Sequence, residues 1–384
     1  MSATKPIDWN PRAQQVINDQ IAAYDAMRRR CPVAYSDQLS WSLFRHGDVV
    51  RVLQDHETFS NAASNHLSIP NTMDPPEHTA YRQIVERYFG AERMAEFEPV
   101  CRAIAETLIG DQRRGEAFEL MTRVAQPFAL RIQCAFMGWP DTLHEPLREW
   151  IGKNHRATRA GDRSAMAQVA VEFDRHIKQQ LVVRRDAGGQ AANDVTSRLL
   201  QEHVHGRPLS DEEIVSIVRN WTVGELGTIA ASVGILVHYL ATHPALQAQL
   251  RRQPGDLADA IDEILRIHAP LIANRRVTTR TVEIDGRKLE AGERLTLIWA
   301  AANRDEAVFG DPDAFDPQRN RDGNLLYGAG VHVCPGAPLA RLELRVLMEA
   351  MLAGTRDISL VATPPPELAA FPASGFSSLQ IRLQ

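Results

Sequence analysis

The sequence predicts a mainly α-helical protein with small antiparallel β-sheets. In most of the chain, apolar residues recur at the three- and four-residue spacing of an amphipathic helix. β-Branched residues are concentrated in two other segments, and a turn dipeptide, Asp285-Gly286, divides the second of them. The expected helices cover 91–111, 118–137, 142–155, 163–185 and 339–351, and the expected strands lie within 35–53 and 278–298.

A long apolar helix is expected from Ile214 to about Thr242. It begins at Ser210-Asp-Glu-Glu213, which has the residues of a capping box, and it ends before His243-Pro244. Its length and composition would also suit a membrane span. Five polar or charged residues interrupt it, so a helix through the protein core is the favoured interpretation. These residues are Arg219, Asn220, Glu225, Thr228 and His238.

Length and composition indicate one globular domain over residues 1–384. The chain has no Gly/Ser linker, low-complexity stretch or internal repeat that would mark a boundary. An apolar fraction of 44% is ordinary for a protein with a sizeable core. The net charge of −5 and the lack of a dense basic cluster argue against a nucleic-acid partner.

Cysteine usage and the N-terminus predict a cytoplasmic protein with no membrane attachment. Four cysteines in 384 residues do not form the pattern of a disulfide framework. The stretch from Met1 to Trp9 has no apolar region of the kind a signal peptide or anchor needs. We expect a monomer.

Cys334 lies in the most informative segment, Leu326-Tyr-Gly-Ala-Gly-Val-His-Val-Cys334-Pro-Gly-Ala-Pro-Leu-Ala-Arg341. Gly330 and Gly336 permit a tight backbone that directs amide N–H groups at the sulfur. The helix that follows adds a favourable dipole for an anion. A thiolate presented in this way among small residues suits a cysteine-ligated haem, whereas the alternative is a buried structural cysteine beside a turn.

This segment resembles the haem-binding loop of the cytochrome P450 family, Phe-x-x-Gly-x-His-x-Cys-x-Gly followed by Leu-Ala-Arg. The first position differs, because Tyr327 replaces phenylalanine and adds a hydroxyl that needs a partner if it is buried. The resemblance implies the P450 fold, with haem b (iron protoporphyrin IX) as cofactor and Cys334 as the iron ligand beside Tyr327.

Three more segments support the resemblance over nearly the whole chain. Glu263 and Arg266 match the family's Glu-x-x-Arg, which the family buries beneath the haem, although such pairs are usually surface ion pairs of little energy. The segments 302–305 and 309–319 match the family's meander. All four signals occur in the family's order and spacing.

The resemblance also implies a set of residues that hold the haem propionates. His78 and Arg82 are four residues apart, about one helical turn, so both side chains project the same way. Arg276 matches the arginine on the strand after the Glu-x-x-Arg helix, and His332 stands two residues before Cys334. Taken one at a time, each would be read as a solvated basic residue.

The long apolar helix carries the main departure from the family. The family pattern Ala-Gly-x-Asp/Glu-Thr aligns with Gly224-Glu225-Leu226-Gly227-Thr228, so Thr228 keeps the alcohol used in proton delivery and Gly227 replaces the acid. Glu225 is three residues from Thr228 on a shared helix face, so it could supply the missing acid. The alternative is a tethered polar residue paired with an arginine. Gly227 also leaves room at the haem.

By position in the family, a mostly apolar set of residues should line a substrate pocket that accepts a small or medium hydrophobic compound. These residues are His66, Leu67, Ile69, Trp221, Val223, Gly224, Leu271, Ile272, Ala273 and Ala373. A short 60–73 connection and the Gly-Glu-Leu-Gly-Thr segment look similar to haem domains fused to a flavin and iron–sulfur reductase.

The resemblance implies a haem-thiolate monooxygenase that draws electrons from NAD(P)H through a ferredoxin or a flavin/iron–sulfur reductase. Two other classes stay open. A peroxygenase would use hydrogen peroxide at the same site, and the missing acid at Gly227 leaves room for it. A non-catalytic haem sensor would have no need of Thr228.

Overall fold

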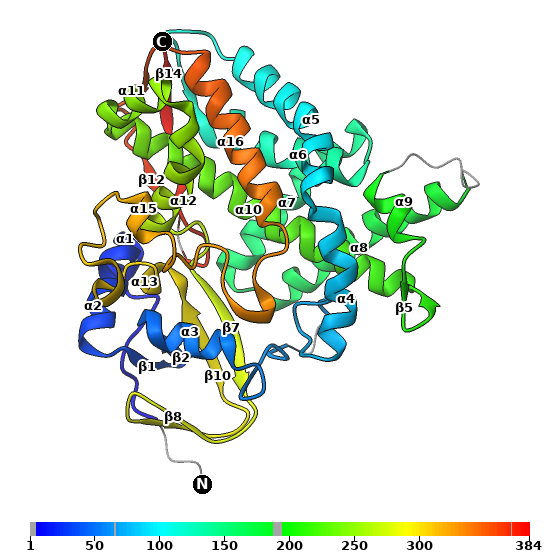
Figure 1. The fold of residues 1–384 in the computed structure, drawn as a ribbon, viewed down its shortest axis with the longest axis vertical. Helices are drawn as coiled ribbons and strands as arrows, with labels where there is room; N and C mark the ends of the chain where they lie inside the picture. Colours follow the sequence, from blue (N-terminus) through cyan, green and yellow to red (C-terminus); the bar gives the residue numbers. More distant parts are fainter. Residues whose placement is uncertain (1–4, 65–66, 187–193, 370) are drawn as a thin grey trace.

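The computed structural model describes residues 5–64, 67–186, 194–369 and 371–384, and helices dominate it (Figure 1). The α-helices are α1 (Gln14–Asn18), α2 (Gln20–Arg30), α3 (His46–Gln54), α4 (Glu77–Glu86), α5 (Ala91–Gly110), α6 (Gln126–Met137), α7 (His144–Ala160), α8 (Arg163–Asp186), α9 (Val195–Leu199), α10 (Asp211–Thr242), α11 (Pro244–Arg252), α12 (Leu257–His268), α13 (Trp299–Ala302), α14 (Glu306–Phe309), α15 (Pro317–Asn320) and α16 (Ala337–Ala353). Short 3-10 turns are η1 (Arg87–Phe89), η3 (Asp141–Leu143), η4 (Pro254–Asp256) and η5 (Gly330–His332), and η2 (Met121–Ala125) is a π-helical turn.

The strands form small sheets beside the helices. They are β1 (Val33–Ser36), β2 (Ser40–Leu43), β3 (Phe59–Ser60), β4 (Ala117–Glu119), β5 (His203–Val204), β6 (Arg207–Pro208), β7 (Ala273–Thr278), β8 (Val282–Ile284), β9 (Arg287–Leu289), β10 (Arg294–Ile298), β11 (Ile358–Leu360), β12 (Glu367–Leu368), β13 (Phe376–Ser378) and β14 (Gln380–Leu383). The largest sheet has the order β1-β2-β10-β7-β3, and the next has the order β11-β14-β4. The remaining strands pair as β12-β13, β5-β6 and β8-β9.

Helix α10 passes through the middle of the helical part and packs against α6, α8, α12 and α16 (Figure 1). Its first turn is held by the expected capping box, in which Ser210 and Glu213 each accept a backbone N–H of the other. The helix is long and apolar enough to cross a membrane, but 67% of its most apolar stretch is buried inside the fold. This burial is what a core helix requires, because each enclosed aliphatic side chain contributes roughly 1.5–3 kcal/mol.

The structure corrects two expectations about the strands. The segment 35–53 is strand only as far as Leu43, and the rest of it forms α3. The reason is visible in the sequence, since Val49, Val52 and Leu53 are buried at helical spacing rather than at the alternate spacing of a strand. The main sheet is also not wholly antiparallel, because β10 runs parallel to β2. The Asp285-Gly286 turn joins β8 to β9 with both residues at positive φ.

A buried ion pair fixes α12 to the loops that lead to Cys334. Arg266 donates to both carboxylate oxygens of Glu263 at 2.8 and 2.9 Å, and the two side chains are almost fully enclosed. Arg266 also donates to the carbonyl of Asn303 at 2.7 Å, and Asn320 donates to Glu263 at 2.7 Å. The Asn303 side chain in turn accepts the N–H of Leu325 at 2.7 Å. The pair is therefore buried and braces this region, as the resemblance implied.

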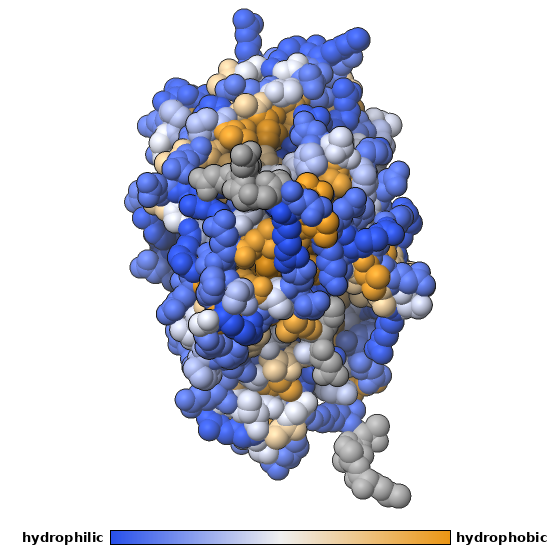
Figure 2. Space-filling view, turned by 90° about the vertical axis from the view of Figure 1, so that its right-hand side faces the viewer, coloured by the Kyte–Doolittle hydropathy of each residue, from blue (hydrophilic) through white to orange (hydrophobic). Residues whose placement is uncertain are grey.

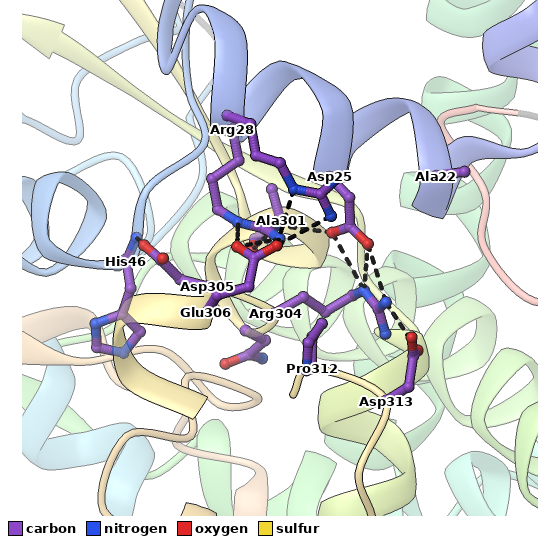
Figure 3. A network of polar contacts seen from close by, with 12 residues as sticks. Ala22, Asp25, Arg28, His46, Ala301, Arg304, Asp305, Glu306, Pro312 and Asp313 are labelled. Carbon is purple, nitrogen blue, oxygen red and sulfur yellow. Dashed lines mark hydrogen bonds and ion pairs between the residues drawn. The ribbon is translucent and has the colours of Figure 1, made fainter. Parts of the chain in front are cut away.

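A second polar network joins α2 to the same region (Figure 3). Arg304 binds Asp25 of α2 at 2.9 Å and Asp313 at 2.8 Å. Arg28 of α2 binds Asp25 at 2.7 Å and Glu306 of α14 at 2.8 Å. Both arginines are buried, so their charges are matched by carboxylates rather than by water. The network holds α2 against the segment that follows β10.

Removal of the buried arginine should destabilise the protein strongly. Arg266→Ala leaves the Glu263 carboxylate buried without its cation, a change that typically costs roughly 3–5 kcal/mol. We expect a large drop in the urea midpoint of unfolding. Arg148→Ala is the matched control, because Arg148 and Glu145 are also three residues apart on a helix but are exposed. Equal midpoints for the two variants would contradict the bracing role.

Candidate active site

Cys334 lies in the loop between η5 and the start of α16. Its backbone N–H donates to the carbonyl of Tyr327 at 2.8 Å, which closes the loop. Gly330 has a φ of +70°, and a Cβ there would stand 2.2 Å from the carbonyl oxygen of Leu53 in α3. No other residue fits that position, because the positive φ and the close backbone both exclude a side chain. The glycine therefore presses the loop against α3.

The sulfur of Cys334 is placed to become a thiolate. The N–H groups of Gly336 and Ala337 at the start of α16 are directed at it, and the charge of Arg82 favours its anionic form. Burial works against these effects and raises the pKa of the free thiol above its ordinary value. The Cys334 residue is nevertheless exposed to water. Metal coordination deprotonates a thiol outright, so this setting suits a metal ligand.

The predicted propionate residues come together from three separate elements. His78 and Arg82 lie on α4, Arg276 on β7 and His332 on η5. The rings of His78 and His332 are 4.2 Å apart between centroids. Burial, followed by the charges of His78, Arg276 and Arg82, lowers the pKa of His332 to about 3. Burial, followed by the charge of Arg82, also lowers the pKa of His78. Both histidines are therefore neutral at pH 7.

These residues lack the negative partners that buried cations need. Among the described residues Arg276 forms no ion pair, although the charge of Asp74 acts on it, and it donates a hydrogen bond to the carbonyl of Arg275 at 2.7 Å. Burial lowers the pKa of Arg276 to about 10. Arg82 binds the half-exposed Glu86 at 2.7 Å, and the Nε2 atoms of His78 and His332 have no partner in the described part of the chain. Such a set suits an anionic group, because unmatched buried charge is costly.

These observations fit haem. The thiolate of Cys334 would supply a ligand to the haem iron, and the described residues contain no cluster of three or more His, Cys, Asp or Glu that could bind a metal by itself. The buried arginines and histidines provide donors for two carboxylates. Tyr327 lies on the other side of the loop, where its ring stacks under the guanidinium of Arg341 at 4.4 Å. Burial raises the pKa of Tyr327 far above its ordinary value, so its hydroxyl stays protonated.

Helix α10 presents an accessible face opposite its buried side. Val223, Gly224, Gly227 and Thr228 lie on this face at helical spacing. A Cβ added at either glycine would meet no atom within 4 Å, so both glycines border open space. The hydroxyl of Thr228 donates to the carbonyl of Gly224 at 2.7 Å, which leaves its oxygen lone pairs available as acceptors.

Glu225 does not have the arginine partner that the sequence offered as an alternative. Its carboxyl group lies within hydrogen-bonding reach of Glu343 on α16, and Oε1 of Glu225 and both oxygens of Glu343 are buried. Sequence reasoning missed Glu343. The sequence signal that would have indicated Glu343 is a carboxylate among the apolar residues Leu339, Leu342 and Val346, which are buried on the same helix. Trp299 was also missed, and its Nε1 is buried without an acceptor among the described residues beside Gly328.

The predicted substrate residues divide into two groups. Leu67, Val223 and Leu271 are large, apolar and exposed, and Gly224 and Ala373 are exposed as well. By contrast Ile69 and Ile272 are packed in two different core clusters, so their side chains are not accessible to a ligand here. That result corrects the expectation for these two residues.

The remaining members of that set have three different outcomes. Trp221 is partly buried and packs against Tyr88 and Phe89. Ala273 is also partly buried, and it packs at the edge of the third core cluster. His66 lies outside the described residues. Figure 2 shows the molecule from the side of α9 and β5, where hydrophobic patches interrupt a mostly hydrophilic surface.

Known proteins are similar to this chain in sequence and in fold. Residues 257–354 match the family model for cytochrome P450. The erythromycin C-12 hydroxylase of Saccharopolyspora erythraea is 33% identical over 352 residues, which are 87% of this chain and 87% of that protein. The cyclomarin C epoxidase CymV of Salinispora arenicola is 30% identical over 84% of this chain and 85% of that protein. A mutant of P450 EryK in complex with erythromycin B superposes with a TM-score of 0.87 at 29% identity, over 95% of this chain and 96% of that one.

The chain therefore belongs to the cytochrome P450 family. It has the P450 fold, and it is a haem-dependent monooxygenase of the bacterial type. The matches cover similar shares of this chain and of these relatives. Neither relative tests the likeness to reductase-fused haem domains, which stays a prediction.

Arg276 and Arg82 should matter for haem retention rather than for the bare fold. Arg276→Ala and Arg82→Ala should each weaken haem binding, by roughly 1–3 kcal/mol for a lost charged hydrogen bond. In the haem-free protein Arg276→Ala should cost no stability, because the guanidinium has no carboxylate partner there. Haem transfer to apomyoglobin measures retention, and thermal unfolding of both forms measures stability.

Arg275→Ala is the matched control for this experiment. Arg275 is adjacent on β7 but exposed, so its loss should change neither haem retention nor stability. Unchanged retention in the Arg82→Ala, Arg276→Ala double variant would show that these residues do not bind the propionates.

Proposed function

We propose that this P450 inserts one oxygen atom from dioxygen into a small-to-medium hydrophobic organic molecule. Electrons originate in NAD(P)H and arrive through a separate ferredoxin or flavin/iron–sulfur reductase. The observation that carries the proposal is the sulfur of Cys334, with two amide N–H groups directed at it and a buried set of basic residues beside it. The enzyme acts as one cytoplasmic domain, as a monomer, without membrane or nucleic acid.

Each residue of the site has a separate task in this proposal. Bound haem supplies the redox chemistry that splits dioxygen and transfers one oxygen atom. Cys334 holds the iron, and the N–H groups of Gly336 and Ala337 moderate the charge on its sulfur. Arg82 and Arg276, with the N–H groups of His78 and His332, hold the carboxylates. The hydroxyl oxygen of Thr228 accepts a hydrogen bond from a water molecule on the open face of α10 and orients it. The hydroxyl acts as an acceptor because its own proton is donated to the Gly224 carbonyl.

The substrate is proposed from the chemistry of the accessible residues. Leu67, Val223 and Leu271 offer apolar contact, and the open space beside Gly224 and Gly227 leaves room near Thr228. The relatives include proteins named as an erythromycin hydroxylase, a cyclomarin epoxidase and a mycinamicin hydroxylase/epoxidase. Their names support hydroxylation or epoxidation of a hydrophobic natural product as the reaction type here.

A peroxygenase is the second candidate, and one observation favours it. Gly227 provides no side-chain acid beside Thr228, and the carboxyl group of Glu225 is directed toward Glu343. Hydrogen peroxide brings its own protons and both oxygen atoms, so a peroxygenase has less need of an acid at this position.

Loss of the thiolate should abolish the spectral signature of the enzyme. The reduced carbon monoxide complex should absorb at about 450 nm, the property after which the family is named. Cys334→Ser should remove this band, because a hydroxyl does not replace a thiolate donor. Cys31→Ser should retain it, since Cys31 lies beside β1, away from the loop. A 450 nm band in Cys334→Ser would end the proposal.

The source of oxygen can be tested by turnover under two conditions. A panel of hydrophobic compounds that shift the Soret band should be turned over with reductase, NAD(P)H and dioxygen faster than with hydrogen peroxide. Thr228→Ala should divert reduced cofactor to peroxide in the first assay, because the oriented water is lost. Thr242→Ala is the matched control, since Thr242 makes the same bond to a carbonyl four residues earlier, at the far end of α10. Faster turnover with peroxide, insensitive to Thr228→Ala, would favour the peroxygenase.

A further inference from the structure

Two carboxyl groups face each other where α10 packs against α16. Glu343 is fully buried on α16, and Oε1 of Glu225 on α10 is buried beside it. Glu225 itself keeps some accessible surface, because it lies at the edge of the open face that carries Gly224 and Thr228. One member of the pair is therefore enclosed, and the other borders the active site.

The pair has no cation. Neither oxygen of Glu343, nor Oε1 of Glu225, has a hydrogen-bond donor among the described residues. The nearest arginines on the packed helices are committed elsewhere. Arg341 binds Asp262 at 2.8 Å, and Arg345 and Arg102 bind Glu98 and Glu349 at the surface.

The other titratable groups whose pKa responds to the pair are the thiols of Cys101 and Cys334 and the phenol of Tyr327, which the charge of Glu343 affects. Cys101 of α5 is buried, and its pKa is raised by burial and then by the charges of Glu343 and Glu225. Cys334 also responds to the charge of Glu225, more weakly than to burial. Neither thiol can neutralise a carboxylate. None of these three groups is a cation, so none of them offsets the charge of the pair.

Two enclosed carboxyl groups in this position cannot both be ionised. Burial is the main cause that raises the pKa of each group. The charge of Glu225 raises the pKa of Glu343 further, whereas the hydrogen bond with Glu343 partly offsets the rise for Glu225. The pKa of Glu225 rises to about 7. Since no other donor reaches Glu343, a proton held between the two groups is the hydrogen-bond donor that satisfies them.

A purely structural carboxylate is treated differently in this protein. Glu263 is also buried, but it accepts hydrogen bonds from Arg266 and Asn320. The Glu225–Glu343 pair has neither type of partner, although it lies between the helix that carries Thr228 and the helix that follows Cys334. The fold thus maintains a protonated acid next to the site where Gly227 lacks one.

We propose that Glu225 and Glu343 form a carboxyl pair that stores a proton for the active site and replaces the acid missing at Gly227. The inference rests on the proposed monooxygenase function. In each transfer the O–H bond of Glu225 breaks, and its electron pair stays on the carboxylate. The proton moves to water on the open face of α10, and the O–H of Glu343 donates a hydrogen bond to the new anion. Glu225 regains a proton from water to complete the cycle.

The first test measures protonation without activity. Infrared pH titration of the haem-loaded protein should show a protonated carboxyl band at neutral pH that is lost in Glu343→Gln and in Glu225→Gln. The pair also has a defined effect on stability. Because its folded-state pKa values are raised above about 4.3, the native protein should lose stability as pH rises toward 7 and beyond. Each glutamine variant should flatten this decline and gain stability at pH 8.

Glu349→Gln is the matched control on the same helix. Glu349 is ion-paired with Arg102 and Arg345, so its replacement should leave the infrared band and the slope unchanged and should not raise stability at pH 8. A wild-type protein without the neutral-pH carboxyl band would overturn the proposal.

The second test measures the fraction of reducing equivalents that reach product. It should fall several-fold in Glu225→Gln while the 450 nm band and haem content stay intact, and Gly227→Asp added to Glu225→Gln should partly restore it. If the infrared band is present but coupling in Glu225→Gln equals that of the wild type, the pair is structural and the storage role is wrong. Different results would contradict the monooxygenase function itself. The wild type would then lack the 450 nm band or would fail to convert any substrate.

Discussion

The buried ion pair between Glu263 and Arg266 is the constraint on which the site depends. Two charges removed from water are stable only when hydrogen bonds satisfy every donor and acceptor. Here the carbonyl of Asn303 and the side chain of Asn320 provide that satisfaction, and Asn303 also holds the N–H of Leu325, nine residues before Cys334. Because the geometry must be nearly ideal, the pair fixes α12, the segment after β10 and the cysteine loop in one arrangement.

The active site then contains charge that the protein leaves unmatched. Arg276 is a buried guanidinium without a carboxylate, and the Glu225–Glu343 pair is buried acid without a cation. Elsewhere in the fold buried charges are matched, as Arg28 and Arg304 are by Asp25. The functional site is therefore the place where buried charged groups lack partners within the described protein. Unmatched basic groups are stabilised by an anionic cofactor, and unmatched acids are stabilised by a proton.

Helix α10 connects these two features because its faces differ. Its buried side chains pack the main core, which fixes its position. Its open face carries Gly224, Gly227 and Thr228 beside Val223, and the two glycines leave open space there. Its remaining edge carries Glu225 toward α16. A single helix thereby provides both the space for a reaction and the acid that serves it.

The sequence by itself determined the features that are local. The spacing of Gly330, His332, Cys334 and Gly336 is read within one loop, and the capping box before α10 and most helix boundaries follow from neighbouring residues. Other features were decided only by tertiary structure. Segment 46–54 forms a helix where strand was expected, although the helical spacing of its apolar residues was present. The burial of Ile69 and Ile272 and the meeting of Glu225 with Glu343 depend on which helix faces which. Periodicity gives the face of a residue but not the neighbour that the face will meet, because that neighbour is chosen by packing across more than a hundred residues of chain.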